Sequence, residues 1–114
     1  MNNSWGHIYW NFLHTMSFEY PENPNTEDMD KYKQFILLLP YILPCKRCKL
    51  HLLNIYKTHP IKHRHLKNRE NFSFYVYQLH NIINMELQKK YYIPYELVKR
   101  TYTNSENCNC VIHD

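Results

Sequence analysis

The chain has 114 residues, which suits a single domain with a core of moderate size. It contains one glycine, Gly6, and this scarcity argues against an all-β or Rossmann-type fold, because hairpins and phosphate-binding loops draw heavily on glycine. The formal net charge is only +4 and the basic residues do not form one stripe, so no nucleic-acid partner is expected.

The first predicted helix begins near Ser4, whose hydroxyl suits an N-cap, and runs to about Phe18. His7, Trp10 and His14 fall within one narrow arc of this helix at ~100° per residue. The arc can be core with hydrogen-bonded histidines. It can also be one wall of a pocket for a flat heteroaromatic ligand, since aromatic rings stack and imidazoles hydrogen-bond. Helix geometry alone favours the core interpretation.

A loop rich in proline and asparagine follows, and Thr26 then begins a second predicted helix with acidic residues in its first turn. Pro40 is expected to bend or end this helix, because proline lacks the backbone N–H that the helical ladder needs. The residues at helical spacing that predict its buried face are Met29, Tyr32, Phe35, Ile36 and Leu39.

A C-x-x-C pair, Cys45 and Cys48, opens the third predicted helix, which runs to about Thr58. One helical turn fits the Cα separation of about 4.4–6.8 Å that an unstrained disulfide requires. The helix N-terminus and three neighbouring cations would favour thiolate over thiol; they are Lys46, Arg47 and Lys49. These features favour a disulfide that cycles, while a structural disulfide or half of a zinc site remain alternatives.

Periodicity also gives the two cysteines different surroundings. Cys48 shares a helix face with Leu52 and Ile55 and is expected to point inward, whereas Cys45 should be more exposed. The basic stretch that follows, from Lys57 to Arg69, is interpreted as a solvated connection between helices.

The fourth predicted helix covers about Asn71 to Lys90 and has an apolar core stripe. Beside that stripe runs a strip of neutral hydrogen-bonding side chains, namely Tyr77, His80, Asn81, Asn84 and Gln88. Either compositional bias filled the strip with asparagine, or it faces a polar ligand. A short last helix is expected from about Pro94 to Tyr102, because proline suits a first helical turn.

These elements predict an all-α fold, a four-helix bundle with a short fifth helix. Residues 1–103 form the predicted domain and residues 104–114 a polar tail. No apolar stretch approaches the ~18 residues of a membrane-spanning helix, and the first residues lack the pattern of a signal peptide. The chain is therefore expected to stay in the cytoplasm, where a C-x-x-C is more often catalytic or metal-binding than a passive crosslink.

The motifs on these helices resemble those of the Erv/ALR family of FAD-linked sulfhydryl oxidases, most closely the minimal versions encoded by large DNA viruses. Order and spacing agree over about residues 5–102. The shared features are Trp5-Gly6, Trp10-x-x-Leu13-His14, Tyr20-Pro21, Pro44-Cys45-x-x-Cys48, His59-Pro60 and His80-Asn81-x-x-Asn84-x-x-Leu87-x-Lys89.

The resemblance implies that FAD is held non-covalently between the helices, with its isoalloxazine beside Cys45 and Cys48. The family usually has an arginine where this chain has His7. The cofactor-binding residues implied are Gly6, His7, Trp10 and His14 on the first helix, with Tyr77, His80, Asn81, Asn84, Lys89 and Tyr102 further along the chain.

The resemblance further implies a homodimer that oxidises dithiols of substrate proteins, such as a thioredoxin-like carrier or virion proteins. Electrons would pass through the Cys45–Cys48 disulfide and FAD to molecular oxygen, giving hydrogen peroxide, in the host cytoplasm or the virion. Cys108 and Cys110 resemble the C-x-C shuttle pair of some members, whereas the structural C-x16-C disulfide of many cellular members is missing from this sequence.

The alternative is a zinc-binding helical interaction module. Four thiolates could form its site, those of Cys45, Cys48, Cys108 and Cys110, with His51, His63 and His65 as further ligands. A C-x-C pair is less suited to a tetrahedral site than a second C-x-x-C would be.

Overall fold

The computed structural model describes residues 3–87 and 93–103, and within these ranges the regular structure is entirely helical. The all-α prediction is confirmed. None of the described helices has the length and apolar character needed to cross a bilayer. The elements in chain order are α1 Asn3–Phe18, α2 Thr26–Ile42, α3 Lys46–Thr58, the 3-10 helix η1 His63–Leu66, α4 Arg69–Glu86 and α5 Tyr95–Thr103.

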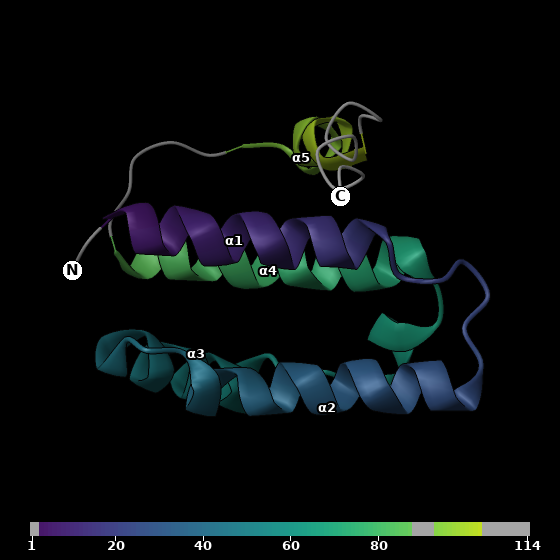
Figure 1. Ribbon diagram of the computed structural model, residues 1–114, viewed down its shortest axis with the longest axis horizontal. Helices are drawn as coiled ribbons and strands as arrows, with labels where there is room; N and C mark the ends of the chain where they lie inside the picture. Colours follow the sequence, from purple (N-terminus) through teal and green to yellow (C-terminus); the bar gives the residue numbers. More distant parts are fainter. Residues whose placement is uncertain (1–2, 88–92, 104–114) are drawn as a thin grey trace, which may run out of the picture.

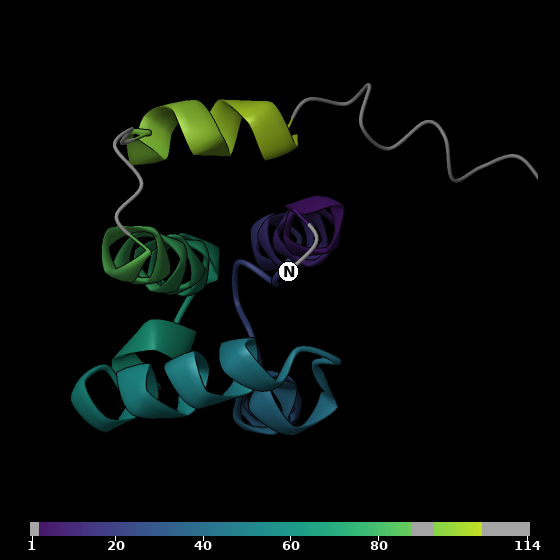
Figure 2. The same cartoon turned by 90° about the vertical axis from the view of Figure 1, so that its left-hand side faces the viewer.

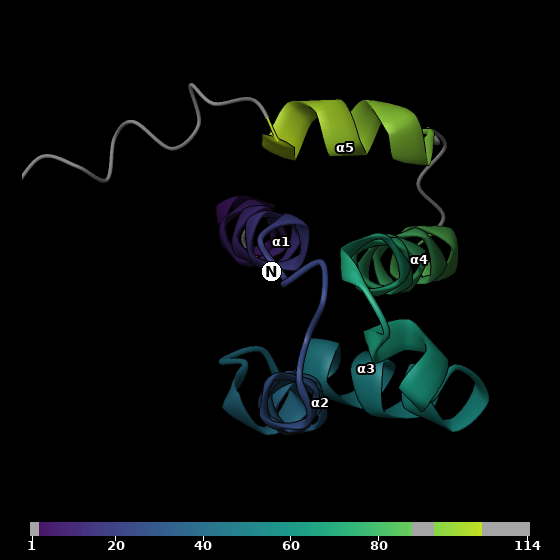
Figure 3. The same ribbon diagram turned by 90° about the vertical axis from the view of Figure 1, so that its right-hand side faces the viewer.

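The helices form three layers. Figure 1 shows α1 and α4 side by side and antiparallel in the middle layer, with α2 and α3 on one face. Figures 2 and 3 show α5 lying across the other face of the α1–α4 pair. The N-terminal half of α1 and the C-terminal half of α4 lie at the same end of the molecule as α3 (Figure 1). This arrangement brings the C-x-x-C pair to the end of the molecule at which α1 begins and α4 ends.

The main hydrophobic core lies between α1, α2, α3 and α4. Ile61 and Leu66, from the connection between α3 and α4, are buried in it, at 6% and 3% exposure. Most residues of this basic stretch are exposed, as predicted for a solvated connection, but its two apolar side chains join the core. Other core members are Trp10, Leu13, Tyr20, Ile36, Leu39, Leu52, Ile55, Phe72, Tyr75, Val76, Leu79 and Ile83.

Side chains before α2, α3 and α4 cap their first turns. At α2, the Asn25 side chain accepts from the Asp28 N–H at 2.7 Å and the Asp28 carboxylate accepts from the Asn25 N–H at 3.1 Å. At α3, Cys45 Sγ accepts from the Cys48 N–H at 3.2 Å. The predicted cap at Ser4 is wrong, since α1 begins at Asn3 and places Ser4 inside the helix.

Pro40 was expected to bend or end α2, and it lies inside the helix and does not end it. Proline lacks the N–H that would bond to the carbonyl four residues earlier, which here belongs to Ile36. The Tyr56 hydroxyl of α3 donates to that carbonyl at 2.7 Å, so a tertiary contact satisfies it. The helix ends instead at Ile42, and its C-cap Leu43 is extended at ψ 131° because the following Pro44 disfavours a helical conformation there.

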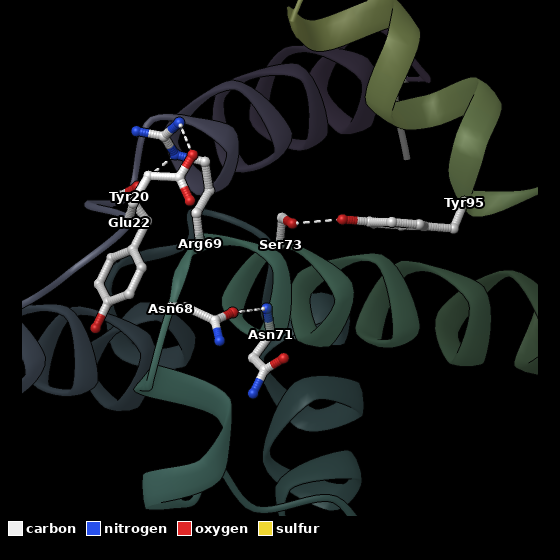
Figure 4. Close-up of polar contacts among 7 residues, drawn as sticks. All are labelled: Tyr20, Glu22, Asn68, Arg69, Asn71, Ser73 and Tyr95. Atoms are coloured by element: carbon white, nitrogen blue, oxygen red, sulfur yellow. Dashed lines mark hydrogen bonds and ion pairs between the residues drawn. The ribbon is translucent and has the colours of Figure 1, made fainter.

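Polar contacts of α4 hold neighbouring segments in place (Figure 4). Arg69 Nε donates to the Tyr20 carbonyl at 2.6 Å, and Nη1 donates to the Glu22 carboxylate at 3.0 Å. The hydroxyls of Ser73 and Tyr95 lie 2.8 Å apart, which links α4 to α5. The Arg69 contacts hold the connection that follows α1, and the Ser73–Tyr95 contact helps to fix α5 over the α1–α4 pair.

Candidate active site

Cys45 and Cys48 form a disulfide at the beginning of α3, with their Cα atoms 5.2 Å apart. Both residues are half-buried, and the expectation that Cys45 is the more exposed of the two stays a prediction. The two residues differ in another way: Cys48 lines a large cavity, and Cys45 is not among its lining residues. The inward direction predicted for Cys48 is therefore a direction into this cavity.

The cavity has a volume of about 780 Å³, within the range of small-molecule and cofactor sites. Its walls come from α1, α4, α5, the residues just before α5 and the first turns of α3. Lys89, one of the predicted cofactor residues, lies outside the described ranges. The other predicted cofactor residues all line this one cavity: Gly6, His7, Trp10, His14, Tyr77, His80, Asn81, Asn84 and Tyr102.

One wall of the cavity is a continuous set of flat rings. The rings of Trp10 and His80 stack at 4.0 Å with an angle of 6° between their planes. His14 Nε2 and His80 Nδ1 are hydrogen-bonded at 2.8 Å. Tyr102 stacks on His14 at 5.1 Å, and its hydroxyl donates to Asn11 Oδ1 at 2.6 Å. The arc predicted on the first helix is thus core and pocket wall together, with Trp10 and His14 buried.

His14 has an unusual environment. Its side chain is 2% exposed, and its Nδ1 has no hydrogen-bond partner among the described residues. Burial lowers the pKa of His14 to about 4, so the ring is neutral near neutral pH. A buried polar atom without a partner costs about 1–3 kcal/mol. A ligand with hydrogen-bonding groups in the cavity could remove that cost.

Gly6 leaves open space on the cavity side of α1. A Cβ atom added at this position would meet no heavy atom within 4 Å. Packing within the protein therefore does not require glycine at this position. A ligand lying against the backbone of α1 would require it, because any side chain would occupy the same space.

The α3 side of the cavity carries polar side chains that the cofactor prediction did not include. Arg47 and His51 line it together with Cys48, and His51 Nδ1 lies 2.9 Å from a carboxylate oxygen of Glu86 on α4. Over the described ranges, no aspartate or glutamate is among the lining residues. The spacing of His51, three residues after Cys48, could have identified it from sequence. The pairing with Glu86 could not, because it joins two different helices.

Residues of α5 were also missed as wall residues, apart from Tyr102. Leu97, Val98 and Thr101 line the cavity. They share a helix face with Tyr102, which lies one to five residues further along the chain. A projection of the short last helix would have grouped them. The shuttle residues Cys108 and Cys110 lie in a part of the chain that the structure does not describe.

A family model described as "Erv1 / Alr family" matches residues 7–103. The chain belongs to the Erv1/Alr family. It is 31% identical over 102 residues to a probable FAD-linked sulfhydryl oxidase of Acanthamoeba polyphaga mimivirus, covering 87% of this chain and 71% of that protein. It is also 31% identical over 101 residues to a FAD-linked sulfhydryl oxidase of African swine fever virus, covering 89% of this chain and 82% of that protein.

The fold agrees with this membership. The crystal structure of the yeast Erv1 core superposes on the chain with a TM-score of 0.80 at 20% identity, covering 92% of this chain and 86% of that one. The family that the motifs indicated is therefore confirmed, and so is the Erv1/Alr type of helical fold.

The zinc-module alternative finds no support in the described part of the chain. There, no group of three or more histidine, cysteine or acidic side chains is placed to hold a metal ion. The sulfurs of Cys45 and Cys48 are bonded to each other. An Erv1/Alr chain with this disulfide beside a ring-lined cavity is better explained by redox chemistry.

Proposed function

We propose that this FAD-linked sulfhydryl oxidase forms disulfide bonds in protein dithiols and passes the electrons through Cys45–Cys48 to FAD. Oxygen is the final acceptor, with hydrogen peroxide as product. Family membership supports the activity. The observation that carries the electron route is that Cys48 lines the same cavity as the stacked rings of Trp10 and His80.

The chemistry of the cavity fits FAD. The flat rings of Trp10 and His80 offer stacking surfaces, and the unpartnered Nδ1 of His14 needs a hydrogen-bonding ligand. When bound, FAD supplies an acceptor for an electron pair and a route to oxygen. The described residues that would hold it are Gly6, His7, Trp10, His14, Tyr77, His80, Asn81, Asn84 and Tyr102.

The chain's own chemistry is thiol–disulfide exchange. A substrate thiolate attacks Cys45 Sγ, the Cys45–Cys48 bond breaks, and Cys48 becomes a thiolate in the cavity. A second substrate thiolate then attacks the substrate sulfur of the mixed disulfide, which releases the oxidised substrate and leaves Cys45 reduced. Positive charge near the pair stabilises these thiolates, from the N-terminus of α3 and from Lys46, Arg47 and Lys49.

Anaerobic mixing with a dithiol tests this route directly. The flavin absorbance of wild-type protein should bleach as electrons arrive from the substrate. A variant that lacks Cys48 should bind FAD and keep its absorbance, because no other cysteine of the described chain lines the cavity. Bleaching at an unchanged rate without Cys48 would show that electrons take another route.

We propose that Cys108 and Cys110 carry electrons from large substrates to Cys45, within a tail spanning residues 104–114 that follows the domain of residues 1–103. Replacing both by serine should leave oxidation of a small dithiol unchanged and slow oxidation of a reduced protein by about tenfold or more. Oxygen consumption with each substrate measures this. Equal slowing with both substrates would contradict a shuttle role.

The substrates are proposed to be protein dithiols of a thioredoxin-like carrier or of virion proteins in the host cytoplasm. The support is analogy with the viral relatives, since the fold itself does not specify a substrate.

We propose that the chain forms a homodimer through an apolar face on α1 and α2. Exposed side chains form this face, and contact between the rings of Phe12 and Phe35 joins the two helices. Apolar surface of this kind on a soluble protein usually marks an interaction site. We define the α1–α2 face as Ile8, Phe12, Leu38, Tyr41 and Ile42, exposed by 69%, 56%, 53%, 62% and 64%.

Replacing Leu38 by aspartate should therefore shift the protein from dimer to monomer in sedimentation, because a charge would be buried without a partner in the proposed interface. Leu50→Asp is the matched control, since Leu50 is 63% exposed but lies on α3. Dissociation by Leu50→Asp, or a dimer that survives Leu38→Asp, would place the interface elsewhere.

A further inference from the structure

Glu86 and His51 form a bonded pair at the edge of the cavity, joining α4 to α3. Nδ1 of His51 lies 2.9 Å from Oε1 of Glu86, and the two side chains are 30% and 35% exposed. His51 lies three residues after Cys48, a spacing at which helical side chains are neighbours with Cβ atoms about 5–6 Å apart. His51 and Cys48 both line the same cavity. The pair therefore sits beside the sulfur that receives negative charge during exchange.

The carboxylate determines which nitrogen of His51 can accept a proton. An ionised carboxylate only accepts hydrogen bonds, so Nδ1 carries the hydrogen and donates it to Glu86. In the neutral ring Nε2 is then the acceptor, and no described residue forms a hydrogen bond with it. A histidine held by a carboxylate next to a thiol has the arrangement that activates cysteine nucleophiles.

We propose that the Glu86–His51 pair is the proton acceptor for thiol exchange, an inference that rests on the proposed function. His51 Nε2 takes the proton of the first substrate thiol as its sulfur attacks Cys45 Sγ. The Cys45–Cys48 bond breaks, and its electron pair stays on Cys48 as a thiolate beside the new imidazolium. Glu86 stabilises that imidazolium through Nδ1–H and acts as a positioning residue.

The balance closes over one turnover. His51 passes the first proton to water, and the second substrate thiol loses its proton by the same route. Its thiolate then attacks the substrate sulfur in the mixed disulfide, forming the product disulfide and releasing Cys45 as a thiolate. Two protons leave to solvent, and the two electrons now on the reduced cysteine pair go to FAD in the proposed activity.

The other titratable and charged groups around the cavity are less suited to this task. Burial holds the pKa of His14 at about 4 and raises that of Tyr9 to about 12, so neither takes up protons near neutral pH. Arg47 is permanently charged and cannot accept a proton. The remaining titratable groups on the walls belong to α1, α4 and α5, and none of them lies on the helix that carries Cys48: His7, Tyr77, His80 and Tyr102.

The test compares His51→Gln and Glu86→Gln in the FAD-loaded enzyme. Anaerobic reduction by excess dithiol should slow at neutral pH by about 10²-fold for His51→Gln and about tenfold for Glu86→Gln, as expected for loss of a general base and of its positioning group. The defect should shrink at alkaline pH, where the substrate thiol ionises unaided. His63→Gln, at an exposed position of η1, is the control and should react like wild type.

A second readout does not depend on turnover. The ¹⁵N spectrum of the His51 ring should show the proton on Nδ1 in wild type, and Glu86→Gln should weaken that preference. If the pair only ties α3 to α4, both variants will unfold at lower temperature with unchanged rates at every pH, and the inference falls. Failure of the proposed function would look different, because the flavin would then be reduced at the wild-type rate in a variant that lacks Cys48.

Discussion

Replacing Cys48 by alanine should abolish thiol oxidation while FAD remains bound. Cys48 is the cysteine that lines the cavity in the described chain, so its loss removes both the leaving group of the exchange and the sulfur next to the cofactor site. We expect turnover to fall by at least about 10³-fold, as for other enzymes that lose a covalent participant. Oxygen consumption with a small dithiol, compared with flavin absorbance per chain, separates lost chemistry from lost cofactor.

The fold should survive this change. The Cys45–Cys48 disulfide closes a very short loop, and in the chain-entropy account such a crosslink stabilises a protein less than one that closes a long loop. Cys48→Ser extends the test when the substrate is supplied as its disulfide. The Cys45 thiolate attacks that disulfide and keeps one substrate sulfur as a mixed disulfide, and the Cys48 thiolate that would displace it is absent. That adduct should appear on a non-reducing gel, whereas Cys45→Ala should give no adduct. Unimpaired turnover by Cys48→Ala would refute the mechanism.

Local sequence signals predicted the helices well, and they failed where a distant contact changes the outcome. Pro40 carries the usual signal for a helix end, yet α2 continues because Tyr56 of α3 satisfies the Ile36 carbonyl. The same limit applies to the basic connection after α3. Its composition indicates solvent, while Ile61 and Leu66 are buried only because α4 folds back over them.

The candidate site likewise combines features that local sequence signals predicted with features that depend on distant contacts. Helical projection grouped His7, Trp10 and His14 on one arc, and these residues do lie on one wall. It could not decide between core and pocket, because the answer depends on His80 stacking against Trp10 from another helix. The pairing of His51 with Glu86 has no local signal at all, since it joins residues 35 positions apart.

Replacing Gly6 by leucine should strongly weaken FAD binding without harming the fold. Leucine has a higher helix propensity than glycine by nearly 1 kcal/mol, and a Cβ here meets no heavy atom within 4 Å, so the cofactor-free protein should be as stable as wild type or more stable. In the proposed complex the same side chain would compete with FAD. Overpacking costs about 1–3 kcal/mol, which corresponds to about 5- to 150-fold in affinity.

Thr15→Leu is the matched control, because Thr15 is exposed on the same helix, is not among the cavity-lining residues, and gains helix propensity in the same direction. FAD titration followed by fluorescence, together with thermal unfolding of cofactor-free protein, measures both quantities for each variant. Wild-type affinity in Gly6→Leu would mean that FAD does not approach the backbone of α1 at this position. Weaker binding with undiminished stability would mean that glycine here serves the cofactor, since the packing of the helix does not need it.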